Sequence, residues 1–151
     1  MLPNSSLKKK KKIRKKKMAS NQAPEGVTSV WHICPQQLWE DSLEKGTYTP
    51  EAYPQDGFVH GCSFAKELVP IGNRFYKSDP RPYVLLRMPL EKLAKADLRF
   101  EAPMPVAGQA SHVSEGLFPH IYEPIAKEFV TEVVSLKRLE DGTFLPVDIQ
   151  D

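Results

Sequence analysis

The stretch DGFVHGCS, residues 56–63, predicts a short strand that ends by presenting a histidine beside a glycine and a thiol. Gly61 is expected to bulge this strand, because a glycine inside a strand often marks a bulge. Ser63 is predicted to cap a helix that begins at Phe64 and carries Glu67 in its first turn. What surrounds His60 depends on the segments before and after this stretch.

The preceding segment VTSVWHIC, residues 27–34, has apolar side chains on both alternating faces and predicts an inner strand. Pro35 is then expected at the first position of a helix, where a missing N–H is tolerated. Apolar residues recur at helical spacing from Leu38 until Gly46 supplies a stop. This first helix is therefore short and amphipathic.

The segments after His60 predict a second helix and further short strands. The helix runs to about Tyr76, and Pro70 either kinks it or begins a new one. Residues 47–56 and 102–116 are rich in proline or small residues and predict loops. Strands are predicted at YVLLRM, ADLRFE, LFPHIY and FVTEVVSLKR, and a last hairpin at DGTFLPV: residues 83–88, 96–101, 117–122, 129–138 and 141–147. Short strands with helices between the early ones imply an α+β fold.

Length and composition indicate one domain, predicted at residues 27–151. The 151 residues, 40% of them hydrophobic, suffice for a single compact core. No run approaches the roughly 18 apolar residues that span a bilayer, and no secretory signal is apparent, so a soluble cytoplasmic protein is expected. Cys34 and Cys62 are then expected to be reduced thiols rather than a disulfide.

Residues 1–26 predict a disordered basic tail. The run LKKKKKIRKKK, residues 7–17, holds nine of the 21 basic residues, repels itself and has no apolar face to bury. It is interpreted as a nuclear address or as an electrostatic contact with RNA or anionic lipid; the alternative is that Met18 is the true start. The other residues include 19 acidic and 12 basic side chains, so only the tail is expected to bind nucleic acid.

Three of the four histidines, His32, His60 and His120, lie in apolar contexts on predicted strands. Each one alone is more often a hydrogen-bonded packing residue than a functional one. Strand ends from different parts of a chain commonly converge on a cleft. The three imidazoles are therefore expected to meet in one cleft as hydrogen-bond donors, acids or ligands.

Two other chemistries remain open at these positions. His32 with Cys34 and His60 with Cys62 share strand faces at a spacing of two, so the four side chains could bind zinc. Zinc sites typically use turn spacings such as C-x2-C instead, and no metal is expected. Cys62 lies just before a predicted helix start, which makes it a candidate nucleophile, and Cys34 shares this feature.

Four motifs follow one another along residues 29–138: VWHICPQQLWEDSLEKGTY, DGFVHGCSFAKELV followed by NRFY, YVLLRM, and LFPHIYEPI. Their order resembles the domain-of-unknown-function family 952, and GFVH-CS and LFPHIY are the most specific pieces. That family is similar to the ADP-ribosyltransferase-like fold. The resemblance implies a split, mostly antiparallel sheet with two or three short helices and a cleft for NAD.

The resemblance also implies a role for each candidate residue. A first-strand histidine holds a ribose hydroxyl of NAD, a second-strand aromatic or histidine packs on nicotinamide, and a later strand supplies a glutamate. The cofactor-binding residues so implied are His32, His60, Ser63 and Arg74. By position His32 takes the first of these roles and His60 the second, and His120 or Glu115 is expected to complete the catalytic site. Gly61 departs from the family's GFIHCS, which has no residue between the histidine and the cysteine.

Two functions follow from this arrangement. Breaking the nicotinamide–ribose bond develops positive charge on the ribosyl carbon, so a site must position NAD and offer acceptor or negative groups. The first hypothesis is an NAD-dependent ADP-ribosyltransferase-like enzyme. The second is a noncatalytic module that uses the same cleft to bind a nucleotide or a protein partner.

Overall fold

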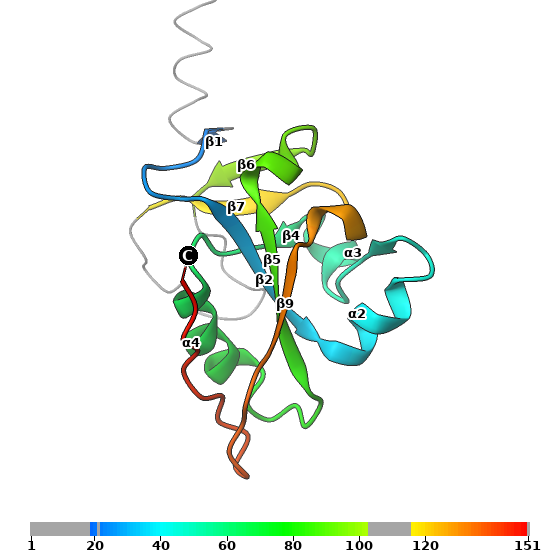
Figure 1. Ribbon diagram of the computed structural model, residues 1–151, viewed down its shortest axis with the longest axis vertical. Coiled ribbons are helices and arrows are strands. Elements are labelled where there is room, and N and C mark those ends of the chain that lie inside the picture. Colours follow the sequence, from blue (N-terminus) through cyan, green and yellow to red (C-terminus); the bar gives the residue numbers. More distant parts are fainter. Residues whose placement is uncertain (1–18, 21, 103–115, 151) are drawn as a thin grey trace, which may run out of the picture.

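The computed structural model describes residues 19–20, 22–102 and 116–150 (Figure 1). Its strands are β1 (Ala19–Ser20), β2 (Ser29–Pro35), β3 (Thr47–Tyr48), β4 (Val59–His60), β5 (Tyr83–Pro89), β6 (Leu98–Glu101), β7 (Phe118–Ile121), β8 (Ile125–Ala126) and β9 (Glu132–Ser135). Its helices are α2 (Gln36–Ser42), α3 (Tyr53–Asp56), α4 (Ala65–Phe75) and the 3-10 helices η1 (Leu90–Leu93) and η2 (Lys127–Phe129). The α+β class and the short helices predicted from the sequence are confirmed.

The strands form three sheets in which every pair is antiparallel. One sheet has the order β2-β5-β9, a second the order β1-β6-β7-β4, and β3 pairs with β8. Trp31 and Cys62 exchange two backbone hydrogen bonds of 2.8 Å, which join β2 to the segment just after β4. The two larger sheets therefore meet at one bridge, and the sheet as a whole is split.

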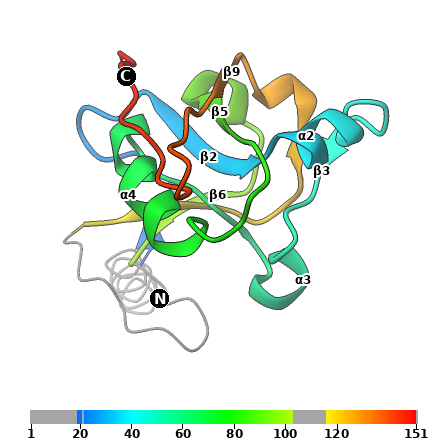
Figure 2. The ribbon, with the colours of Figure 1, turned by 90° about the horizontal axis from the view of Figure 1, so that it is seen from below.

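Each face of the sheet formed by β2 and β5 carries a core, because side chains alternate along a strand. The first core comprises Val30, Cys34, Trp39, Tyr48, Val59, Val84, Leu86, Met88, Leu93, Ile121 and Ile125. The second core comprises Trp31, Ile33, Cys62, Ala65, Leu68, Val69, Tyr83, Leu85 and Phe144. Figures 1 and 2 show α4 and α2 on opposite sides of β2. This double burial explains why both strands are apolar on both faces.

The helix starts differ from the sequence predictions. Pro35 is the last residue of β2 and not the first residue of a helix. Ser63 does not cap α4, which begins at Ala65 after an extended Phe64 and has no side-chain capping bond in the described residues. Packing of α4 on the second core replaces the cap as the source of its stability.

Pro70 lies inside α4, which runs unbroken over 11 residues. Its side chain is exposed, so the carbonyl that lacks an amide partner faces the solvent side of the helix. In the described ranges, no helix is long and apolar enough to cross a membrane.

The predicted loops and the last hairpin are partly described. Residues 47–56 contain β3 and α3 and are not a plain loop. The hairpin is confirmed: Leu139 N donates to the Thr143 carbonyl at 2.8 Å, and Arg138 bridges to Phe144. Most of the loop predicted at 102–116 lies outside the described residues. In the N-terminal segment, β1 pairs with β6.

Candidate functional site

His32 lies on β2 beside the split and uses only one of its ring nitrogens. Burial lowers the pKa of His32 to about 4, against the raising effect of its bond to His60, so the ring is neutral near pH 7. Nδ1 lies 2.7 Å from the His60 carbonyl oxygen, which only accepts, so Nδ1 carries the proton and Nε2 is an acceptor. The residue is 7% exposed, and Nε2 has no hydrogen-bond partner among the described residues.

The position of His32 follows from the split. Trp31 and Cys62 form the backbone bridge between β2 and the segment after β4. A continued antiparallel ladder would pair the His60 carbonyl with the backbone of β2. Instead of a backbone N–H of β2, the His32 ring donates to the His60 carbonyl. One nitrogen therefore has a structural role, and the other is buried without a partner among the described residues.

Gly61 is the residue at which the chain changes strand partner. The residue before it, His60, pairs with β7, and the residue after it, Cys62, bridges to β2. Gly61 N itself donates to the Pro119 carbonyl at 3.0 Å. A Cβ at this position would lie 2.7 Å from Val30 Cγ1, so the close approach of β2 requires a glycine. The predicted bulge is in fact this change of partner.

His60 and His120 form a cross-strand pair on β4 and β7, with ring centroids 5.6 Å apart and ring planes at 75°. His60 Nε2 lies 2.8 Å from Asp56 Oδ2. His120 Nδ1 lies 3.0 Å from Glu101 Oε1, which also accepts a hydrogen bond from the Tyr122 hydroxyl. Each imidazole is thus oriented by a carboxylate at one nitrogen.

The two rings of this pair differ in their access to solvent. The His60 side chain is 39% exposed, whereas the His120 side chain is 3% exposed. The ring of Phe58 contacts both, with centroid distances of 4.6 Å to His60 and 4.2 Å to His120. Burial lowers the pKa of His120, and the bond to Glu101 opposes this effect. His60 is therefore the member that a ligand can reach directly.

The three histidines do not share one cleft. His32 emerges toward the first core, where its ring centroid lies 6.0 Å from that of Tyr48. His60 and His120 each neighbour a residue of the first core on their own strand, so strand alternation directs them away from it. The described residues instead form two sites, the His32 nitrogen and the His60–His120 pair, which are joined through the His60 backbone.

Other predicted site residues lie apart from these two sites. Ser63 is buried just before α4, whereas Arg74 is exposed in its last turn with its guanidinium 5.3 Å from the Phe75 ring. A helix rises by about 1.5 Å per residue, which places Arg74 roughly 14 Å along α4 from its first residue, Ala65. Glu115 lies outside the described residues.

The cysteines are divided between the two cores. Cys34 lies in the first core and Cys62 in the second, so they do not form one site with His32 and His60 as the zinc alternative requires. No group of three potential metal ligands is close enough to hold an ion in the part of the chain that the structure describes. Burial raises the pKa of Cys34 to about 12 and also raises that of Cys62, which leaves both thiols protonated and poor nucleophiles.

The carboxylates that orient the histidines were missed by the sequence analysis. Asp56 precedes His60 by four residues, across the turn at Gly57, and this spacing was the one available signal. Glu101 and Tyr122 reach His120 through the pairing of β6 with β7, which no local pattern reveals.

Two surface hollows lie apart from the histidines. One, of about 500 Å³, lies beside Trp39 and residues 127–133, and the other, of about 260 Å³, lies beside η1 and β6. The residues described as lining them include no histidine. The histidine sites are therefore distinct from both hollows.

These features define a small α+β domain with a split antiparallel sheet and a histidine inserted at the split. The chain belongs to the family described as protein of unknown function (DUF952), whose model matches residues 33–133. Its fold is similar to the crystal structure of protein CC0527 from Caulobacter crescentus, with a TM-score of 0.62 and 24% identity over 78% of this chain and 94% of that chain. The solution NMR structure of CC0527 gives a TM-score of 0.56 and 23% identity over 76% and 89% of the two chains. No curated protein matches this chain.

Proposed function

We propose that the domain binds a ribose-containing nucleotide of the NAD type, with His32 Nε2 accepting a hydrogen bond from a ribose hydroxyl. The observation that carries this proposal is the state of that nitrogen: a buried, neutral acceptor that has no partner among the described residues. A buried acceptor without a donor costs about 1–3 kcal/mol, which a ligand hydroxyl would offset. The choice of an NAD-type nucleotide rests on the resemblance of the motif order to the ADP-ribosyltransferase-like fold.

The nicotinamide ring is assigned to the exposed side of His60, the second of the two histidine sites, so the ligand must pass around the sheet at the split, where the His32 ring meets the His60 carbonyl. Asp56 orients this imidazole, and Phe58 packs against it, so a planar ligand ring meets an already ordered aromatic surface. The carboxylate of Glu101 lies behind His120 and contributes negative charge to the same face of the sheet. Glu115 or His120 completes the site.

The proposed chemistry is transfer of the ADP-ribosyl group. The bond between the ribosyl carbon and the nicotinamide nitrogen breaks, and its electron pair leaves with nicotinamide. The ribosyl carbon is then cationic until an acceptor nucleophile adds to it and loses a proton to a base. A histidine oriented by a carboxylate is suited to take that proton, which assigns this step to His60.

A noncatalytic nucleotide-binding module is the second candidate. It is favoured by the bonding of the acidic side chains nearest the histidines: Asp56 is bonded to His60, and Glu101 to His120 and Tyr122. Carboxylates that already hold neighbouring side chains are less able to stabilise a cationic ribosyl carbon.

Calorimetric titration with NAD and with ADP-ribose tests the proposal. We expect His32→Phe, which keeps the ring volume and removes both nitrogens, to weaken binding about 10-fold, the worth of one hydrogen bond. Trp31→Phe is the matched control, because it removes the other buried nitrogen without a partner in the described residues, which belongs to the second core. Its affinity should stay unchanged. The proposal is overturned if neither nucleotide produces binding heat or a shift in the thermal unfolding temperature.

Release of nicotinamide separates the two candidates. An enzyme releases it from NAD, and His60→Ala abolishes the release while ADP-ribose still binds. Binding of NAD without release at any pH between 5 and 9 would support the noncatalytic module.

A further inference from the structure

β9 is the outer strand of the sheet β2-β5-β9, and its far side has no ladder partner among the described residues. Leu136 N donates to the Tyr83 carbonyl at 3.0 Å. Because the pairs of an antiparallel ladder alternate, the backbone groups of Val133 and Ser135 point away from β5. An open edge of this kind takes up an extended chain by strand addition.

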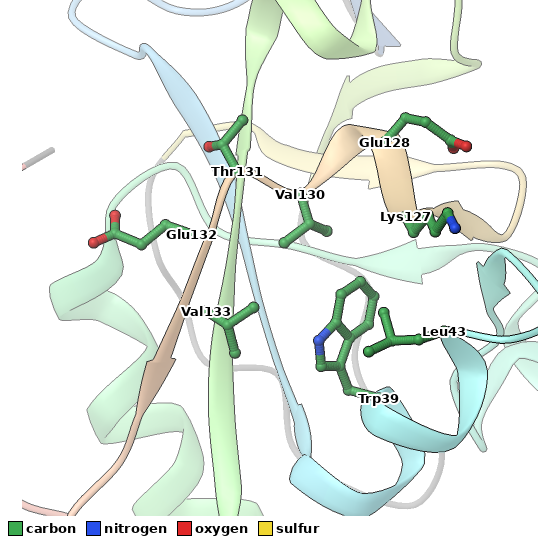
Figure 3. A pocket seen from close by; sticks show the side chains of 8 residues that line it. All are labelled: Trp39, Leu43, Lys127, Glu128, Val130, Thr131, Glu132 and Val133. Atoms are coloured by element: carbon green, nitrogen blue, oxygen red, sulfur yellow. The ribbon is translucent and has the colours of Figure 1, made fainter.

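The hollow of about 500 Å³ lies beside this edge (Figure 3). Figure 3 shows Trp39 and Leu43 of the α2 segment on one side of it and Val130 and Val133 on the other. Leu43 is 40% exposed and Val133 is 45% exposed, although both are large hydrophobic side chains. A strand added to β9 would place one alternate side chain over this apolar surface.

The surroundings of the hollow are acidic. Among the residues that line it, Glu128 and Glu132 are acidic and Lys127 is basic, and Glu132 is paired with Arg87 at 3.4 Å. The segment 36–45, which supplies Trp39 and Leu43, adds three exposed acidic side chains and one exposed basic side chain. The segment that complements this surface is therefore extended and basic, with one aliphatic residue for the hollow.

The chain itself contains a segment of that chemistry. In LKKKKKIRKKK, residues 7–17, Ile13 has basic residues on both sides. In an extended conformation Lys11, Ile13 and Lys15 share one face. Ile13 can then occupy the hollow while the two lysines meet the carboxylates beside it. Lysine also suits the strand that becomes the new edge, because it discourages further pairing.

We assign the segment to another copy of the chain. β1 and β9 lie at opposite ends of the combined strand order, six strand-to-strand steps apart when the Trp31–Cys62 bridge is included. Six steps of about 4.8 Å amount to roughly 29 Å, whereas the four residues from Lys15 to Ala19 span at most about 14 Å. Figures 1 and 2 both show β1 away from β9.

We propose that residues 11–15 of a second copy add to β9 as a strand, with Ile13 in the hollow between Trp39 and Val133. The contact is independent of the nucleotide site, because the residues described as lining the hollow include neither His32 nor His60.

Sedimentation velocity of the full chain over a range of concentrations tests this proposal. We expect reversible self-association that weakens as salt is raised, because charge attraction contributes to it. Ile13→Lys keeps the segment basic and removes the side chain that fills the hollow, so the dissociation constant should rise at least 10-fold. Leu7→Lys makes the same change outside residues 11–15 and should leave association unchanged.

A second pair of variants tests the edge of β9. Ser135→Pro removes an N–H that points away from β5, so the sheet stays intact and strand addition is blocked. Ser135→Ala keeps that N–H and should associate like the wild type. Circular dichroism checks that both variants are folded.

The proposal is overturned if the full chain is monomeric at every concentration and salt. It is also overturned if Ile13→Lys and Leu7→Lys weaken association equally, since that result indicates nonspecific charge attraction. Undiminished association of Ser135→Pro would exclude β9 as the binding edge.

Discussion

His32 uses its two ring nitrogens differently. Its Nδ1 satisfies a carbonyl that the split leaves outside the ladder, and its Nε2 stays free of partners among the described residues. A phenylalanine would fill the same volume and satisfy neither requirement. Loss of Nδ1 should therefore reduce stability, whereas the proposed nucleotide contact depends on Nε2.

The free energy of unfolding is expected to fall as the pH decreases from 6.5 to about 4. The pKa of His32 is lowered from 6.5 to about 4 by folding, so in this range the unfolded chain binds a proton that the folded chain does not. The stabilisation is fully present above pH 6.5, decreases through the window and is exhausted near pH 4. A shift of this size corresponds to roughly 3 kcal/mol.

Urea unfolding at a series of pH values measures this dependence. His32→Gln keeps a donor for the His60 carbonyl but cannot titrate, so its curve should be flatter between pH 6.5 and 4. The remaining slope includes His120, whose pKa is lowered in the same direction. Identical slopes in the two proteins would contradict the assigned role of His32.

Gly61→Ala is expected to destabilise the fold by about 1–3 kcal/mol, because the new methyl group meets Val30 Cγ1 at 2.7 Å. The clash is with a side chain, so shortening that side chain should relieve it. In a double-mutant cycle, Gly61→Ala with Val30→Ala should cost less than the sum of the two single changes. Additive losses in chemical denaturation would show that the backbone, and not Val30, causes the strain.

Among the elements, the inner strands were predictable and the helix ends were not. β2 and β5 are apolar on both faces because each face meets a core, and this pattern is visible in the sequence. The start of α4 depends on where Ala65 packs in the second core, so the capping potential of Ser63 two residues earlier had no effect. Local capping rules gave way to packing.

Pro70→Ala is expected to stabilise the protein by about 1–2 kcal/mol. The alanine restores an N–H that can donate to the Lys66 carbonyl within α4. The free energy gained from this bond exceeds the free energy lost because the unfolded chain becomes more flexible. Pro80→Ala, in the exposed turn before β5, is the control and should be neutral or slightly destabilising. Equal effects in thermal unfolding would mean that Pro70 causes no strain in the helix.

For the whole molecule, the two cores share β2 and β5 and are expected to unfold together. Both cores contain side chains of β2 and β5, so unfolding of these strands disrupts both cores at once. Far-ultraviolet circular dichroism and tryptophan fluorescence should therefore give coincident urea transitions, because Trp39 reports on the first core and Trp31 on the second. Two separate transitions would show that the cores are independent.

Alternation and helical spacing in the chain established the α+β class, the inner strands and the final hairpin, and they marked His32, His60 and His120 as candidate site residues. These signals are local, since they depend on neighbours a few residues away. The change of strand partner at Gly61, the carboxylates beside His60 and His120, and the separation of His32 from that pair arose only on folding. They depend on register between strands far apart in sequence, and register is set by the packing of both cores at once.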